Sequence, residues 1–271
     1  MLTRLWPIAV ITFKEGVRNR ALYGIGAIAV FLLLGTQLVC SMIPRDVGKV
    51  AVDLALSSTS FAGLLIVLFI GINLMAKDLD RRTIYMVLAR PISRGQYILG
   101  KFCGMGLIIG AAMTLLGGAA TVSVLLTRVL YPNYFDKFTL STLFLAILFQ
   151  VLSLLLLTAL SFLYSALSST SFISLLLTVI TYLIGQVTTD IKALVETADK
   201  VGIQVSAAMT FLVKAVYYLF PNLSLFDIKL QAAHGLPVPL TYVAMVSGYW
   251  FLFTALALVA AVLIFERREF P

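Results

Sequence analysis

The chain has 271 residues, of which 61% are hydrophobic and only 12% are charged, and its mean hydropathy is +1.04. Soluble domains carry roughly 25% charged residues, so this chain has too little charge for a surface that faces water, which excludes a soluble enzyme. The formal charge of +8 does not indicate a nucleic-acid partner, because the basic residues lie in short loops beside apolar segments, where topology and anionic lipid account for them. We therefore expect an all-α polytopic membrane protein that forms a single transmembrane domain over residues 1–271.

Residues 1–20 are predicted to form an amphipathic helix that lies in the plane of the membrane interface. One side carries Arg4, Glu15 and Arg18, and apolar residues recur at helical spacing on the other: Leu2, Leu5, Trp6, Ala9, Val10, Phe13 and Val17. Basic positions and a tryptophan are typical of an interfacial helix. A span here would carry four cations into lipid, at about 2.5–3.5 kcal/mol for each one at mid-bilayer.

Six later segments are apolar enough and long enough to cross a bilayer, which takes about 20 helical residues. We place them at residues 21–43, 54–76 and 97–126, at two segments within 140–189, and at 240–265. The uncharged stretch 140–189 is too long for one helix, so its polar run 165–171 is predicted to separate spans four and five. Two glycine pairs in the third span, Gly100/Gly104 and Gly106/Gly110, weakly indicate close helix approach.

The longest connection, residues 190–239, precedes the last span and is predicted to lie on the extracytoplasmic side. Within it, residues 205–220 are apolar, but they are interrupted by Lys214 and stopped by Pro221. A run of this length favours a re-entrant or interfacial helix over a seventh span. The sequence leaves open whether residues 205–220 span the membrane, re-enter it or lie on its surface.

The distribution of lysine and arginine predicts that both termini are cytoplasmic, since short cytoplasmic loops carry an excess of these residues. One side of the predicted topology holds twelve of them: Arg4, Lys14, Arg18, Arg20, Lys77, Arg81, Arg82, Arg90, Arg94, Lys101, Arg267 and Arg268. The other side holds four: Arg45, Lys49, Arg128 and Lys137. The two cysteines, Cys40 and Cys103, then lie near opposite faces and are expected to be buried free thiols.

Chemistry-bearing residues are scarce, and we expect no catalytic, cofactor-binding or metal-binding residue in this chain. The single histidine, His234, is expected to be a solvated loop residue. The large polar residues of the spans, Asn73, Gln150 and Gln186, are expected to serve helix packing. Residues 95–101 match G-x-x-x-x-G-K, but Phe102 follows where a nucleotide-binding loop needs Ser or Thr, so we interpret the match as a coincidence.

The most informative stretch is the loop at residues 77–97, between the second and third spans. Residues 83–88 have helical character, Pro91 ends that helix, and Ser93 is suited to cap the next one. A short helix held between two spans has the form of a docking surface for a cytoplasmic partner. Basic loops are also common in membrane proteins of other kinds, so the residues alone leave both interpretations open.

Taken together, these features resemble the permease subunits of type-2 ABC exporters over essentially the whole chain. The segments that carry the resemblance are Phe13-Lys14-Glu15 with Arg18-Asn19-Arg20, Asp80…Thr83…Leu88-Ala89-Arg90-Pro91-Ile92-Ser93-Arg94 with Gly100-Lys101, the polar break of the four–five hairpin, the long segment before the last span, and Phe265-Glu266-Arg267-Arg268-Glu269-Phe270. The family often has Gly before the loop Thr, whereas this chain has Arg82.

The resemblance implies a coupling site, in which the interfacial helix and the loop at 77–97 contact a separate ATPase subunit. The residues implied in it are Asp80, Arg81, Thr83, Arg90 and Arg94, with Glu15 and Arg18 secondary. ATP and magnesium are expected in the ATPase, and none in this chain. The resemblance also implies a second permease copy, most simply in a homodimer, and export across a bacterial inner membrane.

Two other functions remain compatible with the residues. A stand-alone secondary carrier would need polar or charged groups near the membrane midplane, and the predicted spans have few. A non-transporting scaffold would relay ATPase-driven motion to an extracytoplasmic partner through residues 190–239. The transported substrate is not predictable from the sequence.

Overall fold

The computed structural model describes residues 2–43, 45–72, 74, 93–135, 138–168, 170–200, 211, 213, 215–217 and 219–267. These residues form helices and connecting turns, with no strand among them. Six of the described helices are long and apolar enough to cross a membrane. They confirm the prediction of an all-α polytopic membrane protein.

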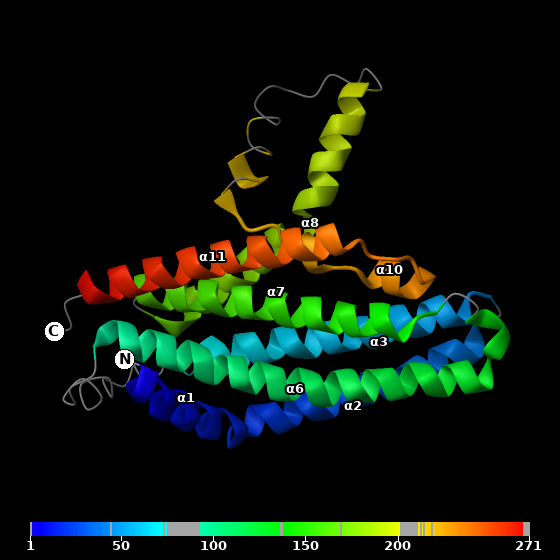
Figure 1. Cartoon of the computed structure of the whole chain (residues 1–271), viewed down its shortest axis with the longest axis horizontal. Coiled ribbons are helices and arrows are strands. Elements are labelled where there is room, and N and C mark those ends of the chain that lie inside the picture. Colours follow the sequence, from blue (N-terminus) through cyan, green and yellow to red (C-terminus); the bar gives the residue numbers. More distant parts are fainter. Residues whose placement is uncertain are drawn as a thin grey trace.

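The first half of the chain forms α1 (Leu2–Val17), α2 (Arg20–Met42), α3 (Val47–Ile66) with its π-helical continuation η1 (Val67–Gly71), and α6 (Arg94–Leu130). The second half forms a short 3-10 turn η2 (Pro132–Tyr134), α7 (Leu140–Leu167), α8 (Ser171–Lys200), the 3-10 turn η3 (Leu223–Phe226), α10 (Lys229–His234) and α11 (Leu240–Arg267). The helices α2, α3, α6, α7 and α11 lie side by side in one elongated bundle, and the later part of α8 stands away from it (Figure 1).

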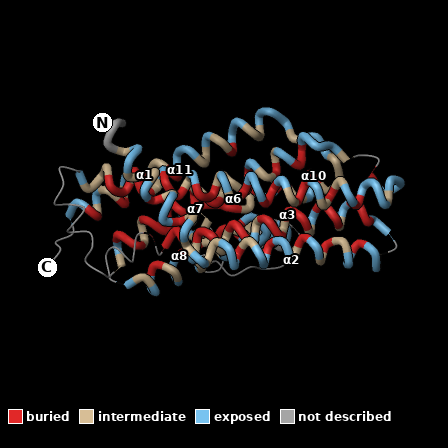
Figure 2. Tube along the Cα trace, turned by 90° about the horizontal axis from the view of Figure 1, so that it is seen from below, coloured by how far each residue is buried: buried red, intermediate tan, exposed pale blue. Residues whose placement is uncertain are grey.

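We call the end of the bundle where α6 begins and α11 ends the proximal end, and the end where α3 and α7 begin the distal end. The first described helix, α1, begins at the proximal end, and the last, α11, ends there (Figure 1). Buried residues follow the sides on which the helices face one another, and the outward sides are exposed (Figure 2). The exposed side chains include many large apolar ones, among them Phe31, Leu115 and Phe251. Such a surface suits lipid better than water.

Each predicted span coincides with a helix of the structure, and several of these helices extend beyond the predicted bounds. The second span, predicted at 54–76, begins at Val47, because Asp46 adopts a left-handed conformation (φ 56°) and forms an ion pair with Lys49 at 2.8 Å. The third span extends to Arg94–Leu130, and the polar break is confirmed, since α7 ends at Leu167 and α8 begins at Ser171. The expectation that both cysteines are buried holds for Cys40 but is wrong for Cys103, which is exposed on α6.

Helix α1 packs along the proximal part of α6 through small residues. A Cβ atom added at Gly100 would lie 2.7 Å from Cβ of Ile8, one at Gly104 would lie 2.5 Å from Cβ of Thr12, and one at Gly16 would meet the side chain of Ile108. Each of these pairs is separated by the same number of residues, so the two helices run in the same direction. The first glycine pair therefore does mark a close helix approach.

The second glycine pair has no such role. A Cβ at Gly106 would only touch Leu155 at 3.5 Å, and one at Gly110 would meet open space. The packed face of α1 also differs from the predicted apolar face, since Thr12 is buried and Trp6 is 63% exposed. Trp6 therefore lies away from the contact with α6, whereas Phe13 is partly buried against the core, and small side chains allow the two backbones to approach.

Polar side chains link the spans inside the bundle. Gln150 of α7 accepts a hydrogen bond from the Thr59 hydroxyl and donates one to the Leu56 carbonyl, both at 2.9 Å, which confirms its predicted packing role. A second link, which the sequence did not indicate, joins Gln37 of α2 to Ser123 and Thr127 of α6 at 2.9–3.0 Å. Asn73 lies outside the described residues.

The connection between α8 and α11 turns back toward the middle of the bundle. Pro221 and Leu223 pack on Gly185 of α8, where an added Cβ would lie 2.8 Å from the Pro221 carbonyl oxygen. The Asn222 amide donates to the hydroxyl of Tyr249 of α11 at 2.7 Å, and Phe226 meets Phe149 of α7. Of residues 205–220, only 211, 213, 215–217, 219 and 220 are described, and all but Phe220 are helical.

The approach of α1 to α6 is testable by adding one methyl group. Gly104→Ala would force that methyl against Thr12 and the Ala9 carbonyl oxygen, 2.7 Å away, and overpacking of this kind costs about 1–3 kcal/mol. We expect a lower melting temperature of the purified protein in detergent. Gly110→Ala, which meets open space in the same helix, is the matched control; equal melting temperatures for the two variants would contradict this packing.

Candidate functional site

The predicted coupling residues divide into two groups. Four of them, Asp80, Arg81, Thr83 and Arg90, lie outside the described residues. The other three are Arg94 on the first turn of α6, Glu15 on the last turn of α1, and Arg18 directly after α1. All three lie toward the proximal end, on elements that flank the loop at 77–97.

The start of α6 is fixed by a capping box. The Ser93 hydroxyl accepts a hydrogen bond from the Gln96 amide, and the Gln96 side chain accepts one from the Ser93 amide, both at 3.2 Å. This arrangement satisfies two backbone donors that a helix start leaves without partners. The loop therefore enters α6 at a defined point, as the sequence predicted for Ser93.

Arg94 joins the start of α6 to the end of α11. Its Nη1 donates to the carbonyl oxygens of Phe265 and Glu266, each at 3.0 Å. These carbonyls belong to the last helical turn, which carries partial negative charge and attracts a cation. The rings of Tyr97 and Phe265 stack beside this contact, with centroids 6.0 Å apart. Arg94 thus acts within the chain, as a link between two spans.

Lys101 was named in the sequence analysis as a cytoplasmic cation and as part of the resemblance, but its place inside the packed site was not predicted. It is 5% exposed, and its ammonium donates to the Leu74 carbonyl at 2.7 Å, lies 3.9 Å from the Glu15 carboxylate and sits 5.6 Å from the centre of the Tyr97 ring. A buried ammonium is stable only with such partners. The signal was present, since a lysine inside an otherwise uncharged apolar run must find buried acceptors. Residues 95–101 are helical, so they form no nucleotide-binding loop.

Glu15 and Arg18 have different surroundings. Glu15 is half exposed and is drawn into the site through Lys101. Arg18 is exposed, and its neighbour Asn19 caps α2 by accepting a hydrogen bond from the Ala21 amide at 3.0 Å. The structure therefore brings Glu15 and Arg94 into one network around α6, and leaves the Arg18 side chain on the surface.

These contacts hold the described residues on either side of 75–92. At one end the Leu74 carbonyl is held by Lys101, and at the other Ser93 is fixed by the helix cap. Just before Leu74, α3 contains the π-helical stretch η1, a local irregularity that is frequent at functional sites. Lys101 and Arg94 therefore join the residues on either side of 75–92 to α1, α6 and α11. Within the described part of the chain, no three His, Cys, Asp or Glu side chains gather as a metal site.

The fold and this network define a multi-pass helical membrane protein in which polar contacts join Leu74, Ser93 and Arg94, on either side of the loop between the second and third spans, to neighbouring helices. Residues 6–270 match the model of a family described as ABC-2 family transporter protein, so the chain belongs to the ABC-2 transporter family and is the membrane subunit of an ABC transporter. This confirms the resemblance drawn from the sequence.

Two relatives carry the same name, probable ABC transporter permease protein NosY. The one from Pseudomonas aeruginosa is 33% identical over 126 residues, which cover 45% of this chain and 46% of that protein. The one from Stutzerimonas stutzeri is 27% identical over 129 residues, which cover 46% of this chain and 47% of that protein. The chain spans about half the length of the curated relatives it matches.

The role of Lys101 is testable with two substitutions. Lys101→Met removes the ammonium and leaves the Leu74 carbonyl without that partner, and an unsatisfied buried acceptor costs about 1–3 kcal/mol. We expect a lower melting temperature and faster proteolysis within residues 75–92. Lys101→Arg keeps a donor, so its melting temperature and proteolysis rate should lie between those of Lys101→Met and the parent protein. Lys14→Met, at an exposed position, should change neither quantity. Unaltered proteolysis in Lys101→Met would show that Lys101 does not anchor the loop.

Proposed function

We propose that this chain is the membrane-spanning permease subunit of an ATP-driven export complex. A separate ATPase subunit binds ATP and magnesium and contacts the loop at 77–97 and helix α1. The observation that supports this best is the fastening of the loop at Leu74 and Ser93, because a docking surface transmits motion only if it is rigidly joined to the spans.

The coupling would operate through contacts that differ between two states of the ATPase. A partner that binds both states of the permease equally shifts no equilibrium. Closure of the ATPases on ATP binding would displace the loop, and the Lys101 and Arg94 links would carry that displacement into four helices. The spans would then tilt and change access to a path between two permease copies, most simply in a homodimer.

We infer that the proximal end is cytoplasmic, in the inner membrane of a bacterium. Among the described residues, the cations toward the proximal end are Lys14, Arg18, Arg20, Arg94, Lys101 and Arg267, and those toward the distal end are Arg45, Lys49, Arg128 and Lys229 of α10; Lys192 and Lys200 lie on the later part of α8. This asymmetry agrees with the excess of lysine and arginine in cytoplasmic loops. Both termini would then be cytoplasmic, and the connection between α8 and α11 would approach the membrane from the extracytoplasmic side.

A second function is a scaffold that relays ATPase-driven motion to an extracytoplasmic partner. It is favoured by the later part of α8, which stands away from the bundle (Figure 1); the residues of α8 beyond Thr189 include the exposed Asp190 and Leu194. Deletion of the projecting residues would distinguish the two functions. Loss of a bound partner with transport intact favours the scaffold.

The coupling role predicts the behaviour of Arg94→Glu. Replacing the cation by an anion removes two hydrogen bonds to α11 carbonyls and adds repulsion from the helix end. We expect the variant permease to insert normally. The ATPase activity of the purified complex should fall by about tenfold, which corresponds to about 1.4 kcal/mol. Arg128→Glu near the distal end should leave the activity unchanged. If no ATPase subunit copurifies, or if Arg94→Glu has parental activity, the proposal is wrong.

The orientation is tested separately by labelling single cysteines. In a background with Cys40→Ala and Cys103→Ser, we expect a membrane-impermeant maleimide to label Ser41→Cys in intact cells. Arg18→Cys, which is exposed at the other side, should be labelled only after permeabilisation. Labelling of Arg18→Cys in intact cells would reverse the proposed topology.

A further inference from the structure

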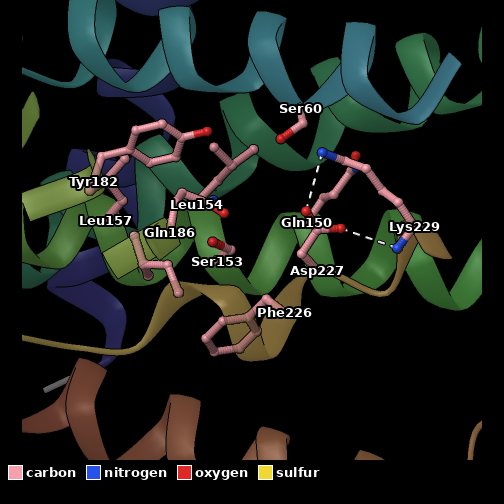
Figure 3. A pocket seen from close by; sticks show the side chains of 11 residues that line it. Ser60, Gln150, Ser153, Leu154, Leu157, Tyr182, Gln186, Phe226, Asp227 and Lys229 are labelled. Carbon is pink, nitrogen blue, oxygen red and sulfur yellow. Dashed lines mark hydrogen bonds and ion pairs between the residues drawn. The ribbon is translucent and has the colours of Figure 1, made fainter. Parts of the chain in front are cut away.

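A small cavity lies inside the bundle, between α3, α7, α8 and the segment 221–234. Figure 3 shows the side chains that line it, which come from all four of these elements. Most of them are polar: Ser60, Gln150, Ser153, Tyr182, Gln186, Asp227 and Lys229. Ser60 lies near the middle of the span formed by α3 and η1, and Gln150 is bonded at the same level, to Thr59. The cavity therefore reaches the middle of the bundle on its Ser60 side, and Lys229 on its other side begins α10, whose last residue, His234, lies near Asp46 and Lys49 at the distal end.

An ion pair forms one wall of the cavity. The Asp227 carboxylate accepts a hydrogen bond from the Lys229 amide at 3.1 Å and lies 3.3 Å from the Lys229 ammonium, as Figure 3 shows. The two side chains are 34% and 22% exposed, so the wall is partly shielded but not sealed. Charged groups at this depth are expensive in a membrane protein and usually mark a functional site. Apolar residues of similar volume would pack the segment at no such cost.

The charges of the lining cancel, and this determines what the cavity can bind. Asp227 and Lys229 neutralise each other, and the other polar residues are neutral donors and acceptors. An ion that entered would lose its hydration without gaining a net opposite charge. A group with both donors and acceptors and no net charge would find partners for each.

The open space is ≈ 20 Å³, which is enough for about one water molecule. A larger group would require the segment 221–234 to move. A few contacts hold that segment, among them the hydrogen bonds from the Asn222 amide to the Tyr249 hydroxyl and from the Tyr242 hydroxyl to the Leu225 carbonyl.

We propose that this cavity is a binding site for an uncharged or zwitterionic hydrogen-bonding group, such as a hydroxyl or an amide. The segment 221–234 closes the site and opens it toward the distal end. Assigning the bound group to a transported molecule rests on the proposed function. The selectivity of the site for uncharged groups does not depend on that function.

The experiment measures the modification of Ser153→Cys, which lines the cavity, in the cysteine-free background. The probes are three methanethiosulfonates applied to intact cells: a small neutral one, an anionic one with a sulfonate, and a cationic one with a trimethylammonium. Rates are divided by those of exposed Ser41→Cys, which removes intrinsic differences in reactivity. We expect the neutral reagent to exceed both charged reagents by about tenfold. Leu148→Cys on the exposed side of α7 controls for entry through lipid and should not react.

Substitution of the ion pair should change the charge preference. Lys229→Met leaves a lone carboxylate and should favour the cationic reagent by about tenfold, whereas Asp227→Asn should favour the anionic reagent. The double variant should again prefer the neutral reagent. An unreactive Ser153→Cys, equal rates for all three reagents, or a reactive Leu148→Cys would overturn the proposal. If the single variants do not fold, the selectivity of Ser153→Cys alone decides. Copurification of the ATPase is measured independently, so a failure here leaves the proposed function standing.

Discussion

One buried ammonium organises the proximal end of this protein. Lys101 holds the Leu74 carbonyl, attracts the Glu15 carboxylate and lies against Tyr97, so a single side chain joins α1, the end of the second span and α6. A charge inside an apolar bundle is stable only where its partners stay in place. The cost of separating them therefore makes the contact rigid, and this rigidity is what a loop needs if force applied to it is to reach the spans.

Hydropathy predicted the architecture of the spans well, since lipid leaves few alternatives to long apolar helices. Ser93 was assigned as a helix cap because capping depends on neighbouring residues alone. The roles of Lys101 and Gln37 were not predictable in this way, because their partners, Leu74 and Ser123, come from other segments of the chain. Four of the seven predicted coupling residues lie outside the described residues, and their role stays a prediction.

The sequence also suggested that the membrane interior has few polar groups, and the structure changes that picture. Asp227 and Lys229 belong to a connection that looked extracytoplasmic, yet they line a cavity beside Ser60 and Gln150. Linear hydropathy cannot detect this, because a segment that folds back into the bundle has no span-like run of its own. Under the proposed function, a transport path would take polar groups from this connection as well as from Ser60 and Gln150 of the spans.

The packing of α1 has a consequence for biosynthesis. Where a glycine meets a side chain between α1 and α6, the residue of α6 comes 92 positions after its partner in the sequence, as Gly100 comes after Ile8. At about 5–20 residues per second, the ribosome takes roughly 5–18 s to make that distance. During this interval the amino-terminal helix has no groove to occupy. Its exposed Trp6 and Lys14 suit it to wait on the lipid surface until the third span is inserted.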